Sequence, residues 1–214
     1  MNCDYVLQYL EKMEVPVVSK KNHDIIMCGL EKMIFLKEGI VKVSTMLEDG
    51  REYNITYIKG PDLLSLMCDT LREDVSYRTR IRVVSEEASF CLISREDFFR
   101  TARQDDKLKD YVEAYYRENL QRALYRQKCM TMNGKSGAVY SFLYNLIPLF
   151  GKECREGILI DVQVTNDDIA GFCGISTRNS VNRILRGLRE ENVIRTVDNK
   201  ILILNAEYLK PYAD

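Results

Sequence analysis

The sequence has little of what most enzyme sites, metal centres and membrane anchors require. Its 214 residues include one histidine, His23, and seven scattered cysteines without a Cys-x-x-Cys pair. A single histidine excludes a His-rich metal site and leaves no choice of base for a catalytic triad. No stretch approaches the roughly 20 apolar residues that a membrane helix needs. We therefore expect no catalytic residues, no metal site and no membrane association.

Signals for export and a surplus of charge are also missing. No basic segment followed by an apolar run opens the chain, so we expect no signal peptide. An odd number of cysteines without a disulfide framework indicates reduced thiols in the cytoplasm. The net charge is −1, from 31 basic and 32 acidic residues. Binding to nucleic acid would therefore have to come from local placement of charge.

Residues 165–189, TNDDIAGFCGISTRNSVNRILRGLR, predict two short helices joined by a tight turn. Thr165 and Asp168 have capping-box spacing, which marks the start of the first helix. Gly174 permits a sharp turn, and either Ser176 or Thr177 can cap the second helix. Apolar residues at i, i+3, i+4 and i+7 predict one buried stripe on that second helix, formed by Val181, Ile184, Leu185 and Leu188.

The opposite face of the second helix is rich in arginine and asparagine. Between residues 176 and 189 there are four Arg and no acid, although the charges of the whole chain balance. This arrangement is typical of a helix-turn-helix, where Arg pairs with guanine and Asn with adenine in the major groove. A solvated amphipathic helix is the alternative, but the missing acids favour DNA. The residues expected at the DNA are Thr165, Ser176, Thr177, Arg178, Asn179, Ser180, Asn182, Arg183 and Arg186.

Before residue 95 the apolar residues alternate with polar ones, which predicts strands. A short helix over 4–13 comes first, and Asp49-Gly50 is a strong hairpin signal. Many short strands with close turns indicate a small antiparallel barrel or jelly roll. The strands are expected over 25–28, 33–37, 40–46, 53–58, 77–85 and 88–94.

A helix without Gly or Pro is expected over 105–130, after a short helix that begins at Ser94. Its wide apolar band includes Tyr115, Tyr116, Leu120 and Leu124. It could be a packed linker, but helix-turn-helix proteins usually bind DNA as dimers, so we favour a seam between two copies.

Asn133-Gly134 interrupts this helix and marks a domain boundary. Beyond it we expect a helix over 136–150, a strand over 158–164, and a wing hairpin of strands 193–197 and 201–204. The predicted fold is α+β. It consists of a barrel at 1–104, a long dimerisation helix at 105–132 and a winged helix-turn-helix at 133–214.

The order of these parts resembles the Crp/Fnr superfamily of bacterial transcription regulators. Residues 34–63, IFLKEGIVKVSTMLEDGREYNITYIKGPDL, are similar to its barrel signature, and 165–185 are similar to its helix-turn-helix pattern. The spacing between Ser176 and Val181 resembles the PrfA-type branch. The resemblance implies a cyclic-nucleotide-binding-like barrel, no enzyme activity, and a homodimer on a palindromic promoter site. It also implies base contacts by Arg178, Asn179 and Arg183, with RNA polymerase as a further partner.

Relatives that bind cyclic AMP carry Gly-Glu-[Leu/Ile] and then Arg-[Ser/Thr]-Ala. Residues 60–63 are instead Gly-Pro-Asp-Leu, and residues 78–80 are Arg-Thr-Arg. Arg78, Arg80 and Arg82 alternate with apolar or small residues, which predicts a solvated strand face. We therefore do not expect cyclic AMP. Cys3 alone cannot ligate the iron–sulfur cluster of other relatives.

Two kinds of control remain open. By likeness to the PrfA-type branch, a small cytosolic molecule such as glutathione could bind between barrel and long helix, near Tyr57 and Lys59. Otherwise the protein has no ligand, and activity follows protein level or a thiol redox change at Cys129 or Cys173, although a buried cysteine is usually a small hydrophobe.

A different class of function is also compatible with the pattern. The chain could be a ligand-binding barrel or an adaptor whose winged domain binds an acidic protein partner. Binding would then be insensitive to DNA sequence.

Overall fold

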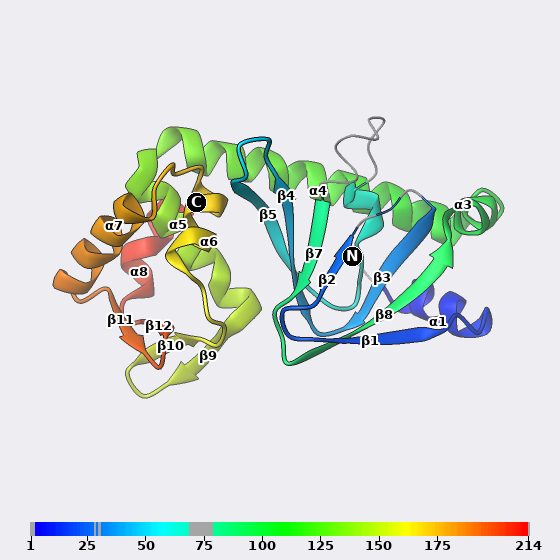
Figure 1. The fold of residues 1–214 in the computed structure, drawn as a ribbon, viewed down its shortest axis with the longest axis horizontal. Helices are drawn as coiled ribbons and strands as arrows, with labels where there is room; N and C mark the ends of the chain where they lie inside the picture. Colours follow the sequence, from blue (N-terminus) through cyan, green and yellow to red (C-terminus); the bar gives the residue numbers. More distant parts are fainter. Residues whose placement is uncertain (1–2, 28, 30, 69–78, 214) are drawn as a thin grey trace. The chain divides into compact units, whose positions relative to one another are not determined.

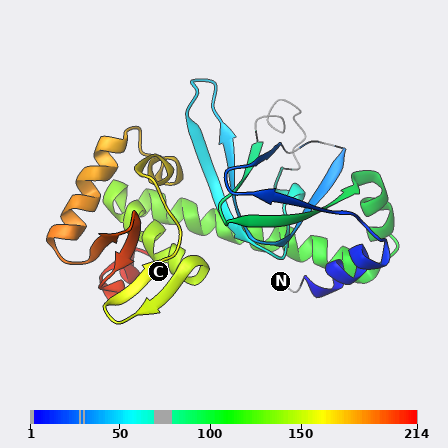
Figure 2. The same cartoon turned by 60° about the horizontal axis from the view of Figure 1, so that its bottom comes forward.

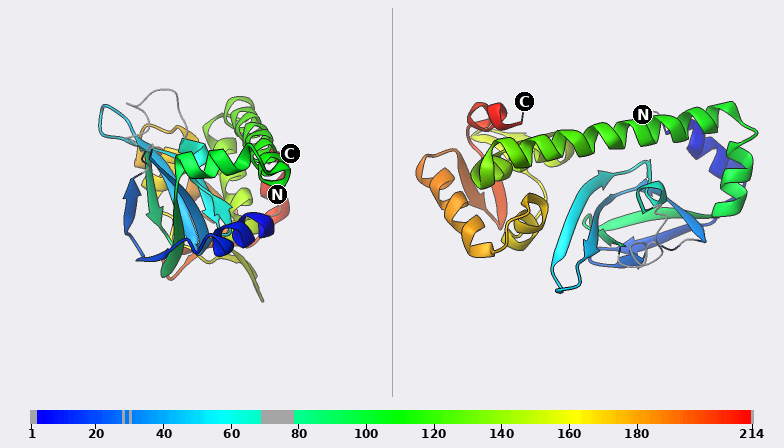
Figure 3. Two further views of the ribbon diagram at one scale, coloured as in Figure 1. Left: turned by 90° about the vertical axis from the view of Figure 1, so that its right-hand side faces the viewer. Right: turned by 90° about the horizontal axis from the view of Figure 1, so that it is seen from above.

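The computed structural model describes residues 3–27, 29, 31–68 and 79–213. The chain divides into two compact units, Met1–Ala123 and Leu124–Asp214. The division falls inside α4 (Asp106–Met132), which Figure 3 shows as one continuous helix. The first turns of α4 therefore pack within the first unit, and its last turns pack within the second.

Among its described residues, the first unit forms two antiparallel sheets of four strands each (Figures 1 and 2). The first sheet has the order β1-β8-β3-β6, and the second has the order β2-β7-β4-β5. This is the jelly roll that the alternating sequence predicts. The strands are β1 (Val17–Lys21), β2 (Ile25–Met27), β3 (Lys32–Glu38), β4 (Ile40–Met46), β5 (Glu52–Lys59), β6 (Asp62–Leu63), β7 (Thr79–Val83) and β8 (Glu87–Ser94).

Strand β3 shows why part of this sequence is apolar without a break. Ile34 and Leu36 belong to a core that also contains Val41, Val43 and Ile81 of the second sheet. The alternate residues of β3 pack on the other side of the sheet. There Met33, Phe35, Cys91 and Ile93 join a core with three helices, α1 (Asp4–Lys12), α3 (Arg95–Ala102) and the start of α4. A strand that is covered on both faces needs apolar residues at every position.

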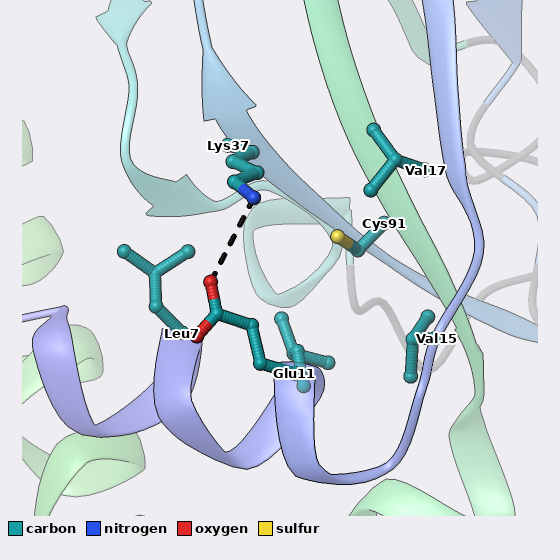
Figure 4. A pocket seen from close by; sticks show the side chains of 7 residues that line it. Leu7, Glu11, Val15, Val17, Lys37 and Cys91 are labelled. Atoms are coloured by element: carbon teal, nitrogen blue, oxygen red, sulfur yellow. Dashed lines mark ion pairs between the residues drawn. The ribbon is translucent and has the colours of Figure 1, made fainter.

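A small cavity lies beside α1 in this unit (Figure 4). Its volume is about 30 Å³, and Lys37 Nζ stands 3.7 Å from Glu11 Oε1 at its edge. The space holds no more than a water molecule or two. Its lining residues are Leu7, Leu10, Glu11, Val15, Val17, Lys37 and Cys91.

Most expected elements of the first unit are present with small shifts at their ends. Strands β1 and β6 were not expected, because β1 is a half-exposed edge strand and β6 has two residues. Strand β7 begins at Thr79, whereas Tyr77, Arg78 and Cys28 of the expected strands lie outside the described residues.

The polar face of the second sheet is less exposed than the alternation of β7 predicts. Lys42 is only 2 % exposed, and its Nζ donates to Glu52 Oε2 at 3.1 Å. Ser44 donates to Glu52 Oε1 at 2.6 Å, and Arg82 Nη2 is 3.7 Å from the same oxygen. Burial alone would raise the pKa of Glu52, but Ser44, Lys42 and Arg82 together lower it. The expected alternation of β7 is confirmed, but Arg82 is only partly exposed because β4 and β5 bring Glu52 beside it.

The second unit contains a four-stranded antiparallel sheet of order β11-β12-β10-β9 and several helices. Asp198 and Asn199 have φ of +47° and +60°, which makes the two-residue turn of the expected wing. Strand β9 and the short C-terminal helices were not expected. The elements are α5 (Gly134–Phe150), β9 (Gly151–Cys154), β10 (Gly157–Ile160), α6 (Asn166–Cys173), α7 (Arg178–Glu190), β11 (Ile194–Val197), β12 (Lys200–Ile203), α8 (Ala206–Leu209) and η2 (Lys210–Tyr212).

Within the described ranges, no helix combines the length and the apolar character needed to cross a bilayer.

Candidate nucleic-acid interface

Helix α6 begins with the expected capping box. Thr165 Oγ1 accepts the N–H of Asp168 at 3.0 Å, and the N–H of Thr165 donates to Asp168 Oδ2 at 3.1 Å. The Thr165 hydroxyl also donates to this carboxylate at 2.7 Å. The cap satisfies two N–H groups that have no partner within the helix, and it fixes where the helix starts.

The turn between α6 and α7 depends on Gly174. Its φ is +62°, a left-handed conformation that glycine adopts without a Cβ penalty. The N–H groups of Gly174 and Ile175 both donate to the Ala170 carbonyl, the second at 3.0 Å. Ile175 is buried, so the turn is anchored into the core on one side. This confirms the predicted helix, turn and helix.

Thr177, rather than Ser176, caps helix α7. Thr177 Oγ1 accepts the N–H of Ser180 at 3.3 Å and lies 2.9 Å from Ser180 Oγ. Both Ser176 and Thr177 are exposed, and Ser180 is half-buried. These hydroxyl groups therefore surround the N-terminus of α7, where N–H groups and the helix dipole favour a phosphate.

The two faces of α7 are divided as predicted. Val181, Leu185 and Leu188 are buried, and Ile184 is half-buried. Figure 1 shows α7 running along one side of the second unit. The exposed face carries Arg178, Asn179, Asn182, Arg183 and Arg186.

One acid belongs to α7 beyond the acid-free stretch. The helix continues to Glu190, whose Oε1 is 3.5 Å from Arg186 Nε. Both side chains are mostly exposed, so the pair is weak and competes little with a phosphate. Arg183 and Arg178 lie nearer the N-terminal end of the helix, about one and two turns further from Glu190 than Arg186 is.

The apolar band of α4 consists of a buried part and an exposed part. Leu108, Tyr111 and Tyr115 are buried against the barrel core. In contrast, Tyr116, Leu120 and Leu124 are 44 %, 61 % and 57 % exposed. They follow a spacing of four residues, so they form one stripe, here called the α4 stripe. The sequence gives no signal that separates adjacent Tyr115 and Tyr116.

The two residues expected near an effector lie on β5. Tyr57 is buried and Lys59 is exposed. Alternate residues of a strand point to the same face, and Tyr57 is in register with Lys42 on β4. The structure therefore brings Tyr57 beside the buried Lys42 and Glu52 network, a neighbour that the sequence does not predict.

The cysteines proposed for redox control are both buried. Burial raises the pKa of Cys173 to about 12, although the charge of Arg126 opposes the shift. A thiol that stays protonated at neutral pH reacts slowly with oxidants. The geometry favours the alternative in which Cys173 is a small buried hydrophobe. Over the described part of the chain, no group of three His, Cys, Asp or Glu side chains is placed to hold a metal ion.

Arg126 was not identified as functional from the sequence, where it stands in a row of mostly apolar α4 positions. Its Nη2 donates to the Phe172 carbonyl at 2.6 Å, and its guanidinium carbon lies 5.6 Å from the centre of the Phe172 ring. Phe172 is the penultimate residue of α6, so this contact joins the last turns of α4 to the helix-turn-helix. An arginine in an apolar row is the only sequence signal for it.

Residues 138–212 match the Crp-like helix-turn-helix domain. The chain is 44% identical over 209 residues to the lactate racemization regulatory protein of Lactiplantibacillus plantarum, which covers 96% of this chain and 95% of the relative. It is 29% identical over 185 residues to the listeriolysin regulatory protein of Listeria monocytogenes, covering 86% and 77%. A transcriptional regulator of the CRP family from Thermus thermophilus has the same fold, with a TM-score of 0.73 at 20% identity over 92% of this chain and 96% of that structure.

Proposed function

Because the chain belongs to the Crp/Fnr family of transcription regulators, which bind DNA through a Crp-like helix-turn-helix, we propose that it acts as a homodimer on a palindromic promoter site. The observation that carries the proposal is the division of α7 into a buried apolar face and an exposed Arg and Asn face. A helix of this kind fits the major groove and presents donors to base edges.

The proposed base contacts come from the start of α7. Arg178, Asn179 and Arg183 are exposed and lie within the first two turns of the helix. Arg178 and Arg183 suit guanine, and Asn179 suits adenine. Asn182 is exposed beside them and completes the face.

Phosphate contacts position the helix without specifying sequence. We assign them to Ser176, Thr177 and Ser180 at the N-terminus of α7, and to Arg186 further along it. Thr165 lies at the N-terminus of α6, where its hydroxyl already donates to Asp168. Its expected contribution is therefore to present the backbone N–H groups of α6 to the DNA backbone.

The α4 stripe is the proposed dimer seam. Tyr116, Leu120 and Leu124 expose large apolar surfaces along one line of a 27-residue helix. A second copy of the same helix covers such a line through knobs-into-holes packing. Dimerisation would present two α7 helices to two half-sites of a palindrome.

A small cytosolic effector is the proposed means of control. Reduced glutathione is one candidate, by likeness to the branch of the listeriolysin regulatory protein. The relative at 44% identity is named for the regulation of lactate racemization, so the two lactate enantiomers are further candidates. Tyr57 and Lys59 remain the residues proposed to line the effector site, and promoter activity would follow contact with RNA polymerase.

The proposal is tested by selecting DNA from a random pool with purified protein at near-physiological salt. Parallel selections contain no addition, reduced glutathione, D-lactate or L-lactate. We expect a palindrome with half-sites about one helical turn apart. An effector is identified when the enrichment of that palindrome depends on its presence.

A pool that stays unenriched under all four conditions would contradict the proposal. That result would favour the adaptor alternative, in which the Arg face of α7 binds an acidic protein and has no preference for DNA sequence. Removing the charge of Arg186 then tests whether this face contacts DNA at all, because loss of a phosphate contact weakens binding to all DNA sequences equally.

A further inference from the structure

A side chain from the last turns of α4 caps the end of α6. Arg126 Nη2 donates to the Phe172 carbonyl at 2.6 Å, one turn or less from the end of α6. The last carbonyls of a helix lack partners within it, and the helix dipole favours a cation there. Arg126 supplies both the donor and the charge, from a different helix.

The side chain of Phe172 is held from two sides. The Arg126 guanidinium lies 5.6 Å from its ring centre, and the ring of Phe142 in α5 stacks on it at 4.8 Å with an interplanar angle of 26°. A guanidinium over an aromatic face adds attraction to the hydrogen bond. Phe172 is therefore the point where α4, α5 and α6 meet.

The turn that follows is packed against α4 as well. A Cβ at Gly174 would lie 3.0 Å from Met130 Cε, so the turn backbone almost touches this side chain. Met130 is four residues after Arg126, on the same face of α4. Two α4 side chains, one turn apart, thus hold the end of α6 and the turn before α7. Leu124 of the α4 stripe is half a turn from Arg126, so the proposed seam and the contact to the motif lie on roughly opposite sides of the same helix.

We propose that Arg126 is a positioning residue for DNA recognition, which fixes the helix-turn-helix on the end of α4 without touching DNA. The inference rests on the proposed function. A palindrome is recognised only when both α7 helices are held at the spacing of the two half-sites. Binding to random DNA depends mainly on charge and tolerates looser geometry. Loss of Arg126 therefore lowers affinity for the selected site more than affinity for random DNA.

Cys173 provides a built-in probe of this contact. It follows Phe172 directly and is 7% exposed, so a thiol reagent reaches it only when the end of α6 opens. The charge of Arg126 lowers the pKa of this thiol, against the larger effect of burial. Electrostatics alone would make Cys173 less reactive when Arg126 is removed. Faster labelling after its removal would therefore report opening.

The experiment compares Arg126→Ala, Arg126→Gln and Arg126→Lys in the full chain, with Arg122→Ala as the matched control. Arg122 is one turn earlier on α4, and its side chain is 62% exposed. Cys173 labelling is quantified by peptide mass spectrometry. We expect it to be about 10- to 100-fold faster in Arg126→Ala, the range for losing a hydrogen bond to a charged group. Arg126→Lys and Arg126→Gln retain a hydrogen-bond donor, so their labelling rates should fall between those of Arg126→Ala and the wild type. These two variants also keep the test possible if Arg126→Ala does not fold.

Binding of the same proteins to the selected palindrome and to random DNA gives the second measurement. We expect the ratio of the two affinities to fall about tenfold for Arg126→Ala and to stay unchanged for Arg122→Ala. Equal loss on both DNAs would overturn the positioning role, because it would indicate only a lost charge. If Arg126→Ala had the same Cys173 labelling rate and the same ratio of affinities as the wild type, the positioning role would also be overturned. Selection of a palindrome by the wild-type protein would still leave the proposed function intact.

Discussion

The α4 stripe gives a prediction whose size can be worked from the structure. The variant Leu120→Gln with Leu124→Gln replaces two exposed apolar side chains in each copy. Glutamine has nearly the helix propensity of leucine, so α4 should persist. The substitution therefore changes the surface of the proposed seam and leaves the helix itself unchanged.

The expected loss follows from the surface that remains to be covered. Complete burial of a leucine side chain is worth about 1.5–3 kcal/mol. Leu120 and Leu124 are still 61 % and 57 % exposed, so covering the remainder gives about 0.9–1.8 kcal/mol each. A twofold dimer contains four such side chains, so the seam loses about 4–7 kcal/mol. The dissociation constant of the dimer should rise about a thousandfold or more.

Sedimentation equilibrium over a concentration series measures this constant directly. Circular dichroism checks that the helix content is retained. Arg122→Gln is the control, because its side chain points roughly opposite to the stripe on α4. If the double variant dimerises with the wild-type constant, the α4 stripe is not the seam and the reasoning from exposed apolar surface is refuted.

Two further predictions concern the stability of each unit. Gly174→Ala should lower the free energy of unfolding of the second unit by about 1–2 kcal/mol, because φ is +62° at this position and Met130 crowds a Cβ there. Urea denaturation measures the loss, with Gly187→Ala as the control because a Cβ at Gly187 meets open space. Equal effects of the two substitutions would contradict this prediction. Glu52→Gln should destabilise the first unit by about 3 kcal/mol at neutral pH, because the buried ammonium of Lys42 loses its charged partner. Because the pKa of Glu52 is lowered in the folded protein, the wild type has this stability above about pH 4.3 and loses it as the pH falls. The free energy of unfolding of the variant should therefore change less with acid pH than that of the wild type. Parallel pH profiles of the two proteins would contradict the assignment.

The helix-turn-helix could be predicted from the sequence because every signal in it is local. The capping box at Thr165, the turn at Gly174 and the apolar stripe of α7 each depend on residues within one or two turns. The remaining ambiguity was between Ser176 and Thr177 as the cap. The structure resolves it, because Thr177 accepts the N–H of Ser180.

The parts that could not be predicted depend on pairing between distant segments. Lys42 alternates with the apolar Val41 and Val43, yet it is buried, because Glu52 of β5 pairs with it and also with Arg82 of β7. The sequence of strand β1 has no periodic signal, and the strand is held in the sheet by its backbone pairing with β8. The cap from Arg126 to Phe172 joins residues 46 positions apart, beyond any local pattern.

The central claim is that the exposed face of α7 recognises DNA sequence, and one substitution tests it most directly. Arg183→Ala should weaken binding to the selected palindrome by about 1–3 kcal/mol for each lost bidentate contact and relax specificity at one base pair of each half-site. Random DNA should be affected no more than by Arg155→Ala, which removes the same charge from the exposed turn between β9 and β10. Wild-type affinity of Arg183→Ala for both the palindrome and random DNA would contradict the account.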